Sequence, residues 1–104
     1  MTRSQEVAQV ILSQIGGKRF QMMTGAKNFI AGQNENKEHY LSFKIPRSNK
    51  ITHITISLTV MDEYNMKFIS VHGTKIKDVA EVKGLFFDQL QEVFTEYTGL
   101  LTRM

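Results

Sequence analysis

Hydrophobic and polar positions alternate most regularly between residues 51 and 72. The alternating sets are Ile54, Ile56, Leu58 and Val60 on one side and Thr55, Ser57 and Thr59 on the other. A period of two is typical of a strand that has one buried and one solvated face. Turn-forming residues 62–65 interrupt the pattern, which resumes at Met66, Phe68 and Val71. This stretch predicts an antiparallel hairpin with a loop of about three to five residues.

Further strands are predicted on both sides of this hairpin. Leu41, Phe43 and Ile45 alternate with polar residues until Pro46 ends the pattern. The link from there to the hairpin is only about five residues long, which favours antiparallel neighbours. Residues 74–82 fit either a helix or an edge strand, and we prefer a short strand because its lysines would deter edge-to-edge aggregation.

The segment from residue 18 to residue 38 is the most unusual part of the pattern. Phe20 and Met22 alternate with polar residues, which predicts a strand entering the sheet, and Gly25 predicts a bulge or a bend after it. Residues 31–38 are polar and rich in turn formers, so we expect a surface loop there.

Two helices complete the predicted fold. Residues 4–15 have apolar side chains at three- and four-residue spacing, Thr2 and Gln5 have capping-box spacing, and Gly16-Gly17 ends the helix. From about residue 85, one apolar helix face is predicted, made of Phe86, Leu90, Val93, Phe94 and Tyr97. Thr98-Gly99 closes this helix, and Leu100-Leu101 can fold back against its last turn. The predicted fold class is α+β: an N-terminal helix, a four- to five-stranded antiparallel sheet and a C-terminal helix in a two-layer sandwich, forming a single domain over residues 1–104.

Composition narrows the possible chemistry. The 104 residues include no Cys, which excludes disulfides, thiolate nucleophiles and zinc sites built on sulfur. No apolar run approaches the ~20 residues that cross a bilayer, so we expect no membrane association and a cytoplasmic location. We also expect no cofactor.

Charge is unevenly distributed along the chain. Residues 1–77 carry 11 Lys or Arg against 5 Asp or Glu, whereas residues 78–104 carry 2 against 5. This pattern predicts a basic sheet beside an acidic helix. Such polarity suits an anionic partner or head-to-tail self-association, and a homodimer is one possible outcome. The alternative is that each surface is simply solvated.

Catalytic groups are scarce. His39, His53 and His72 are the three imidazoles, and the predicted hairpin would make His53 and His72 cross-strand neighbours. No acidic residue is placed to complete a metal or proton-relay site with them. The sequence also lacks the common nucleophile-elbow, zinc-protease, dinucleotide and Walker motifs. We therefore expect neither a metal site nor an enzyme.

Binding is the favoured class of function. The solvated sheet face would present Tyr40, Ser42, Lys44, Thr55, Ser57, Thr59 and Lys67, and phosphates are contacted by side chains of these polar types. The candidate binding residues are Lys18, Arg19, Thr24, Lys27, Asn28, Tyr40, Lys44, Arg47 and Lys50. Single-stranded bases also need aromatic platforms, for which Tyr40 is the main candidate. A protein partner, a second copy of the chain, or plain solvation would fit the same face.

Several local patterns occur together along the chain. They are Ile11–Ile15 followed by Gly16-Gly17, Phe20 with Met23–Phe29, Leu41–Pro46, Asp62 with Tyr64 and Phe68, and Phe94-Thr95-Glu96 with Thr98-Gly99-Leu100. This order resembles small single-domain proteins encoded by bacteriophages and related mobile elements of bacteria. The resemblance implies a genomic setting and a body plan, and it carries over no site residues. Small proteins of such elements usually act by binding nucleic acid, a host protein or a small nucleotide.

These observations predict a non-enzymatic binding protein of a phage or mobile element that acts on nucleic acid or a host factor through a basic sheet face. One alternative is a protein-interaction inhibitor of a host defence enzyme. The other is a protein that captures a small nucleotide with the loop from Thr24 to Asn28, although this loop lacks P-loop spacing.

Overall fold

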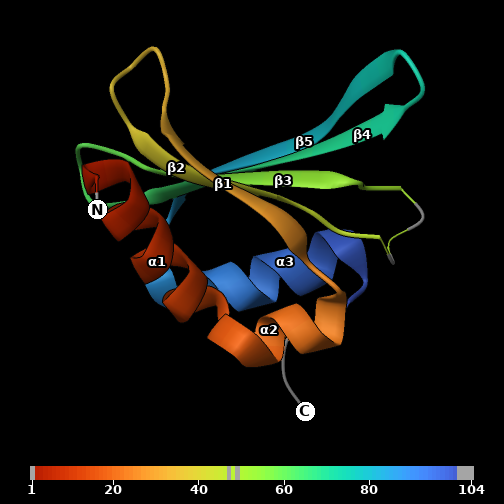
Figure 1. The fold of residues 1–104 in the computed structure, drawn as a ribbon, viewed down its shortest axis with the longest axis horizontal. Coiled ribbons are helices and arrows are strands. Elements are labelled where there is room, and N and C mark those ends of the chain that lie inside the picture. The colour runs from red at the N-terminus through yellow and green to blue at the C-terminus, as the bar shows by residue number, and fades with distance from the viewer. Residues whose placement is uncertain (1, 47, 49, 101–104) are drawn as a thin grey trace.

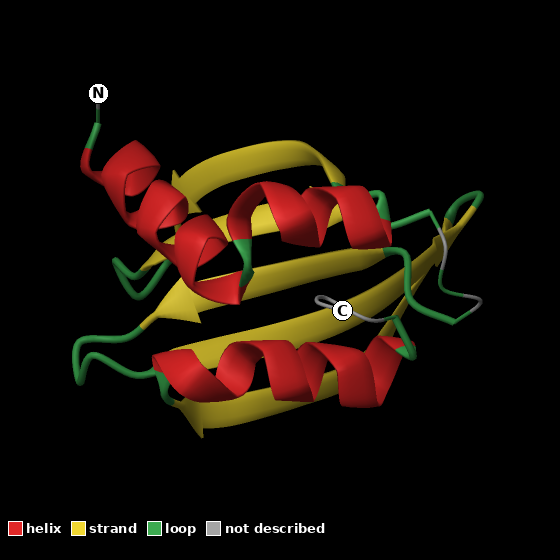
Figure 2. Cartoon of the chain, turned by 90° about the horizontal axis from the view of Figure 1, so that it is seen from below, coloured by secondary structure: helices red, strands yellow, loops and turns green. Residues whose placement is uncertain are grey.

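The chain folds into one antiparallel sheet with all its described helices on one face. The computed structural model describes residues 2–46, 48 and 50–100. The elements in chain order are α1 (Arg3–Ile15), α2 (Gly17–Thr24), β1 (Lys27–Gln33), β2 (His39–Lys44), β3 (His53–Leu58), β4 (Tyr64–His72), β5 (Lys75–Leu85), the 3₁₀ helix η1 (Phe87–Gln89) and α3 (Leu90–Thr98). The five strands pair in sequence order, each antiparallel to the next. The helices lie below this sheet in Figure 1 and in front of it in Figure 2, which confirms the predicted α+β class and its two layers.

The first helix begins and ends where the sequence predicts. The capping box is formed: the Gln5 amide donates to Thr2 Oγ1 at 3.2 Å, and the Thr2 amide donates to Gln5 Oε1 at 3.0 Å. At the other end, Gly16 adopts a φ of 130°, a conformation that costs other residues strain. Between these ends, α1 buries Val7, Ala8, Ile11 and Ile15 against the sheet.

The strand predicted over residues 18–22 is wrong, because this segment is the helix α2. Gly16-Gly17 joins two helices instead of leading into the sheet. Phe20 and Thr24, four residues apart, form the buried side of α2, whereas Met22 is 78% exposed. Gly25 has a φ of 71° and is the left-handed C-cap of α2, so it marks no bulge in a strand.

The sheet is longer at both edges than the sequence predicts. β1 extends through the expected loop to Gln33, which leaves residues 34–38 for the turn. A β-bulge interrupts β1, since Lys27 pairs with Lys44 but Ile30 pairs with Ser42, and the bulged Asn28 has a φ of 59°. At the other edge, the preferred strand interpretation of residues 74–82 is confirmed by β5, which runs on to residue 85.

The core lies between the inner sheet face and the helices. The largest fully buried side chains are Phe20, Phe43, Phe68, Phe94, Ile11, Ile15, Ile45, Ile51, Ile54, Ile56, Met66 and Leu90. The Phe20 ring meets those of Phe43 and Phe94 edge-on, with centroids 5.4 and 5.0 Å away. Phe20 on α2 therefore joins the sheet to α3.

Two predicted details at the ends of the hairpin and of the last helix are wrong. Val60 is 86% exposed in the β3–β4 turn and does not continue β3. Phe86 is 56% exposed because it precedes η1 and so lies outside the buried helix face. Gly99, with a φ of 74°, ends α3 as predicted, and Leu100 packs against the core, whereas Leu101 lies outside the described residues.

Among the described helices, none has the length and apolar character that a membrane crossing would need.

Candidate functional site

The outer face of the sheet, on the side away from the helices, is open to solvent. The strand register aligns its side chains in three rows: Ile30, Ser42, Thr55, Lys67 and Glu81; Gly32, Tyr40, Ser57 and Asn65; and Lys44, His53, Ile69 and Asp78. The Thr55 hydroxyl donates to Ser42 Oγ at 3.3 Å across β2 and β3. The β1–β2 and β4–β5 hairpins project away from the helices and flank this face (Figure 1). The result is a polar platform between two raised hairpins.

Tyr40 provides the aromatic ring of this platform. Its ring lies across the backbone of Gly32 on the neighbouring strand β1. A side-chain carbon added at Gly32 would lie only 2.5 Å from the Tyr40 hydroxyl oxygen, so this placement needs glycine beneath the ring. Tyr40 is half-buried by this contact and keeps part of its surface open to solvent.

Lysines gather at one end of the strands. In an antiparallel meander, the start of β1, the β2–β3 connection and the β4–β5 turn share one end of the sheet. The lysines there, which we call the basic end, are Lys27, Lys44, Lys50, Lys75 and Lys77. Lys27 and Lys44 are direct cross-strand partners, and Asn28 is exposed beside them. Like charges directly opposite each other destabilise a sheet, so an anion between these two lysines would be favourable.

The opposite end of the strands carries mainly acidic residues. Glu35 and Glu38 lie in the β1–β2 turn, Asp62 and Glu63 in the β3–β4 turn, and Asp88 in η1 just beyond β5, with Lys37 and Lys83 as the nearby cations. The charge separation therefore runs along the strands as well as between sheet and helix. On the outer face itself, Lys67 is partly neutralised by Asp78 at 3.7 Å.

The structure brings only some of the predicted binding residues together. Lys18 and Arg19 are exposed on α2, in the helical layer on the other side of the sheet from Tyr40. Thr24 is fully buried: its hydroxyl donates to the Phe20 carbonyl at 2.7 Å and accepts from the Ala26 amide at 3.2 Å. These bonds close the end of α2 and leave no free hydroxyl for a ligand.

The remaining predicted residues define the candidate surface. Lys27, Asn28, Lys44 and Lys50 lie at the basic end, and Tyr40 lies on the adjoining outer face. Arg47 lies outside the described residues.

The three histidines do not converge. His53 pairs with Ile69 and His72 with Lys75, so the expected cross-strand contact between His53 and His72 is wrong. Nδ1 of His53 is hydrogen-bonded to Thr52 Oγ1, and Nδ1 of His39 to Ser4 Oγ, both at 2.8 Å. Within residues 2–46, 48 and 50–100, no cluster of His, Asp and Glu could hold a metal ion.

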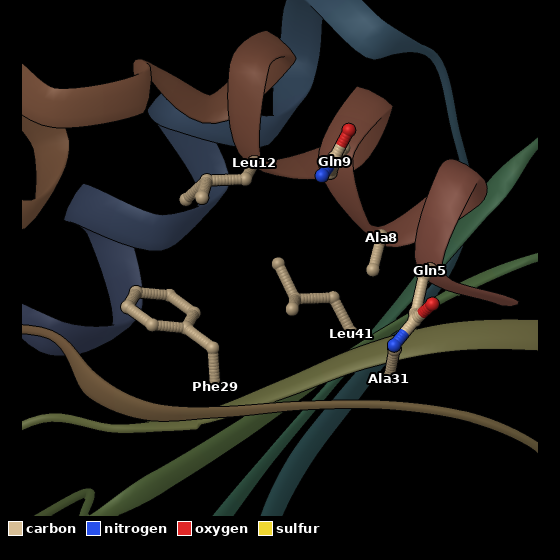
Figure 3. A pocket seen from close by; sticks show the side chains of 7 residues that line it. All are labelled: Gln5, Ala8, Gln9, Leu12, Phe29, Ala31 and Leu41. Carbon is tan, nitrogen blue, oxygen red and sulfur yellow. The ribbon is translucent and has the colours of Figure 1, made fainter. Parts of the chain in front are cut away.

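Two apolar features were missed by sequence reasoning. A groove of 520 Å³ lies between α1 and the strands β1 and β2 (Figure 3). Its walls are Ala8, Leu12, Phe29, Ala31 and Leu41, with Gln5 and Gln9 also lining it.

The second feature is a set of exposed apolar side chains at the acidic end, namely Val60, Met61, Phe86 and Phe87. Both pairs lie at the same end of the sheet, because Tyr64, which follows Val60 and Met61, is the cross-strand partner of Leu85, which precedes Phe86.

Comparisons with protein-family models, with curated proteins and with solved structures find no match for this chain. Its class is therefore defined by fold and surface: an α+β protein with a five-stranded antiparallel meander, helices on one face and an open polar face on the other. The arrangement offers lysines, hydroxyls and one partly exposed ring, which are groups that bind ligands.

Proposed function

We propose that this chain is a non-enzymatic binding protein that holds nucleic acid at the basic end of its sheet and along the adjoining outer face. The observation that carries this proposal is the cross-strand pair of Lys27 and Lys44 beside an uncovered face of hydroxyl groups. The proposal keeps the expectation of a phage or mobile-element protein, a kind of protein that usually binds nucleic acid, a host protein or a small nucleotide.

Each group on the surface has a role that follows from its chemistry. Lys27, Lys44 and Lys50 would contact successive phosphates, and the hydroxyls of Ser42 and Thr55 would donate to phosphate or sugar oxygens. Tyr40 would stack on one base, a contact worth about 1–3 kcal/mol in single-strand complexes. The acidic end would repel the backbone, so the bound strand would be confined to the basic half of the face.

Charge reversal at the two ends of the sheet tests this proposal. The variant Lys27→Glu/Lys44→Glu reverses the cross-strand pair, and Lys37→Glu/Lys83→Glu makes the same change in net charge at the acidic end. Fluorescence anisotropy with single- and double-stranded oligonucleotides should show a loss of about tenfold or more for the first variant and little change for the second. Both pairs are solvent-accessible, and circular dichroism should show that both variants keep the wild-type fold.

Two results would contradict the proposal. One is wild-type protein that binds no probe at low salt. The other is an equal loss in the two charge-reversal variants, because net charge alone would then account for binding.

A second candidate function, binding of a host protein, is favoured by the acidic end. There the exposed Val60, Met61, Phe86 and Phe87 lie at the same end of the sheet as Asp62, Glu63 and Asp88, which suits a partner with an apolar patch rimmed by basic residues. A stoichiometric partner retained from host lysate by wild-type protein and lost with Met61→Ser/Phe87→Ser would support it.

Capture of a small nucleotide by the loop from Thr24 to Asn28 has less support, because the Thr24 hydroxyl already closes α2.

A further inference from the structure

The two free edges of the sheet are protected very differently. An edge strand presents unpaired amide and carbonyl groups, and proteins commonly guard such strands with charges and bulges. β5 has both, with Lys75, Lys77, Asp78, Glu81 and Lys83 along its length and a register shift at residue 79. By contrast, β1 carries no charged residue between Asn28 and Gln33. The β1 edge therefore lacks the charges that would keep another strand away.

The side chains of β1 offer apolar contacts on both faces of the sheet. On the outer face, Ile30 is 58% exposed, so a large aliphatic side chain is open to contact there. On the inner face, Phe29 and Ala31 form one wall of the 520 Å³ groove, opposite Ala8 and Leu12 of α1 (Figure 3). A strand added beside β1 would therefore bury apolar surface on each side in addition to forming backbone hydrogen bonds.

We propose that the occupant of this edge is the β1 strand of a second copy of the chain, paired antiparallel about a two-fold axis. Such an interface is isologous, so it needs a self-complementary strand, and the uncharged residues 29–33 can face themselves without repulsion. Each Phe29 would stay in its own subunit, where its ring centroid lies 5.5 Å from that of Phe43, and the added strand would cover the side of the groove at the sheet edge. The bulge at Asn28 bends the strand and confines pairing to the segment that follows it.

The two-fold dimer also determines how the outer faces and the basic ends of the two subunits lie relative to each other. A two-fold axis perpendicular to the sheet keeps both outer faces on the same side and joins them into one continuous face. Because the strands of the two subunits then run in opposite directions, the two basic ends lie at diagonally opposite corners. The dimer itself does not depend on nucleic-acid binding, although two linked surfaces would raise the avidity for a long strand.

The test measures solution mass without nucleic acid. Sedimentation equilibrium of the wild-type chain should give twice the 11.9 kDa chain mass. Ile30→Lys should give a monomer, because it removes the apolar outer-face contact and places two lysines close to each other on the paired strands, where like charges repel. The matched control is Ile76→Lys on β5, where the side chain is 71% exposed, and this variant should remain dimeric. Both positions lie outside the core, and circular dichroism should show that both variants are folded.

Cross-linking identifies the edge directly, since the chain has no Cys of its own. Ile30→Cys treated with a short bis-maleimide should yield a covalent dimer, and Ile76→Cys should not. A wild-type monomer at millimolar concentration, a dimer that survives Ile30→Lys, or cross-linking through position 76 would overturn the proposal. Moderate salt should weaken nucleic-acid binding but not this uncharged interface, so failure of one proposal is distinguishable from failure of the other.

Discussion

Tyr64 shows how a single residue joins the helical layer to the sheet. Its ring is 5% exposed at the start of β4, and its hydroxyl donates to Gln14 Oε1 on α1 at 2.5 Å. Burial raises the pKa of this phenol above its usual value of 10.0, and the nearby Asp62 carboxylate adds to the increase. The protonated phenol is therefore the form that the folded chain favours.

The raised pKa of Tyr64 predicts a loss of stability in alkaline solution. Because the pKa is higher in the folded state than in the unfolded state, the stabilising contribution is complete below about pH 10 and is lost as pH rises through the folded-state pKa. Tyr64→Phe should lower the free energy of unfolding by about 1 kcal/mol at neutral pH and should reduce the further loss above pH 10. Urea unfolding between pH 7 and 11 measures both effects. Gln14→Ala is the control, because it removes the same hydrogen bond but should keep the loss of stability above pH 10. If Tyr64→Phe kept that loss unchanged, ionisation of Tyr64 would not be its cause.

At the scale of secondary-structure elements, the sequence predicted those whose pattern repeats several times. α1 has four buried positions and a complete cap, and β2 and β3 alternate throughout their lengths. α2 could not be predicted this way, because its eight residues bury only Phe20 and Thr24, and the pair Phe20 and Met22 imitates strand alternation. The error also displaced β1, so the pairing of Lys27 with Lys44 and the uncharged edge were not predictable.

Because α2 is a helix and not a strand, substitutions of Phe20 and Met22 should have very different effects on stability. Phe20 and Met22 would share one face of a strand, but in α2 Phe20 is fully buried and Met22 is 78% exposed. Phe20→Ala should lower the free energy of unfolding by about 3–5 kcal/mol, because it leaves a cavity between Phe43 and Phe94. Met22→Ala should change it by no more than about 0.5 kcal/mol. Similar losses in the two variants, measured by denaturant titration, would contradict the helix.

At the scale of the whole molecule, the distribution of charge follows from the meander. Successive turns of an antiparallel meander lie at alternate ends, so the acidic β1–β2 and β3–β4 turns share one end and the lysines near the other connections share the opposite one. The linear count of charges suggested only a basic sheet and an acidic helix, and it missed the separation along the strands because it ignored this alternation. The groove could not be predicted from the sequence, because it depends on the position of β1 relative to α1 and no local sequence pattern encodes that position.

The charge distribution also predicts how binding should depend on salt. Each phosphate neutralised on a single strand contributes about −0.7 to the slope of log K against log salt concentration, so contacts from Lys27, Lys44 and Lys50 should give a slope of about −2. Lys50→Ala should make the slope less negative by about 0.7, because this lysine lies at the basic end. Lys37→Ala removes the same charge at the acidic end and should leave the slope unchanged. Anisotropy titrations at several salt concentrations measure these slopes, and an equal change in both variants would mean that the strand is not confined to the basic end.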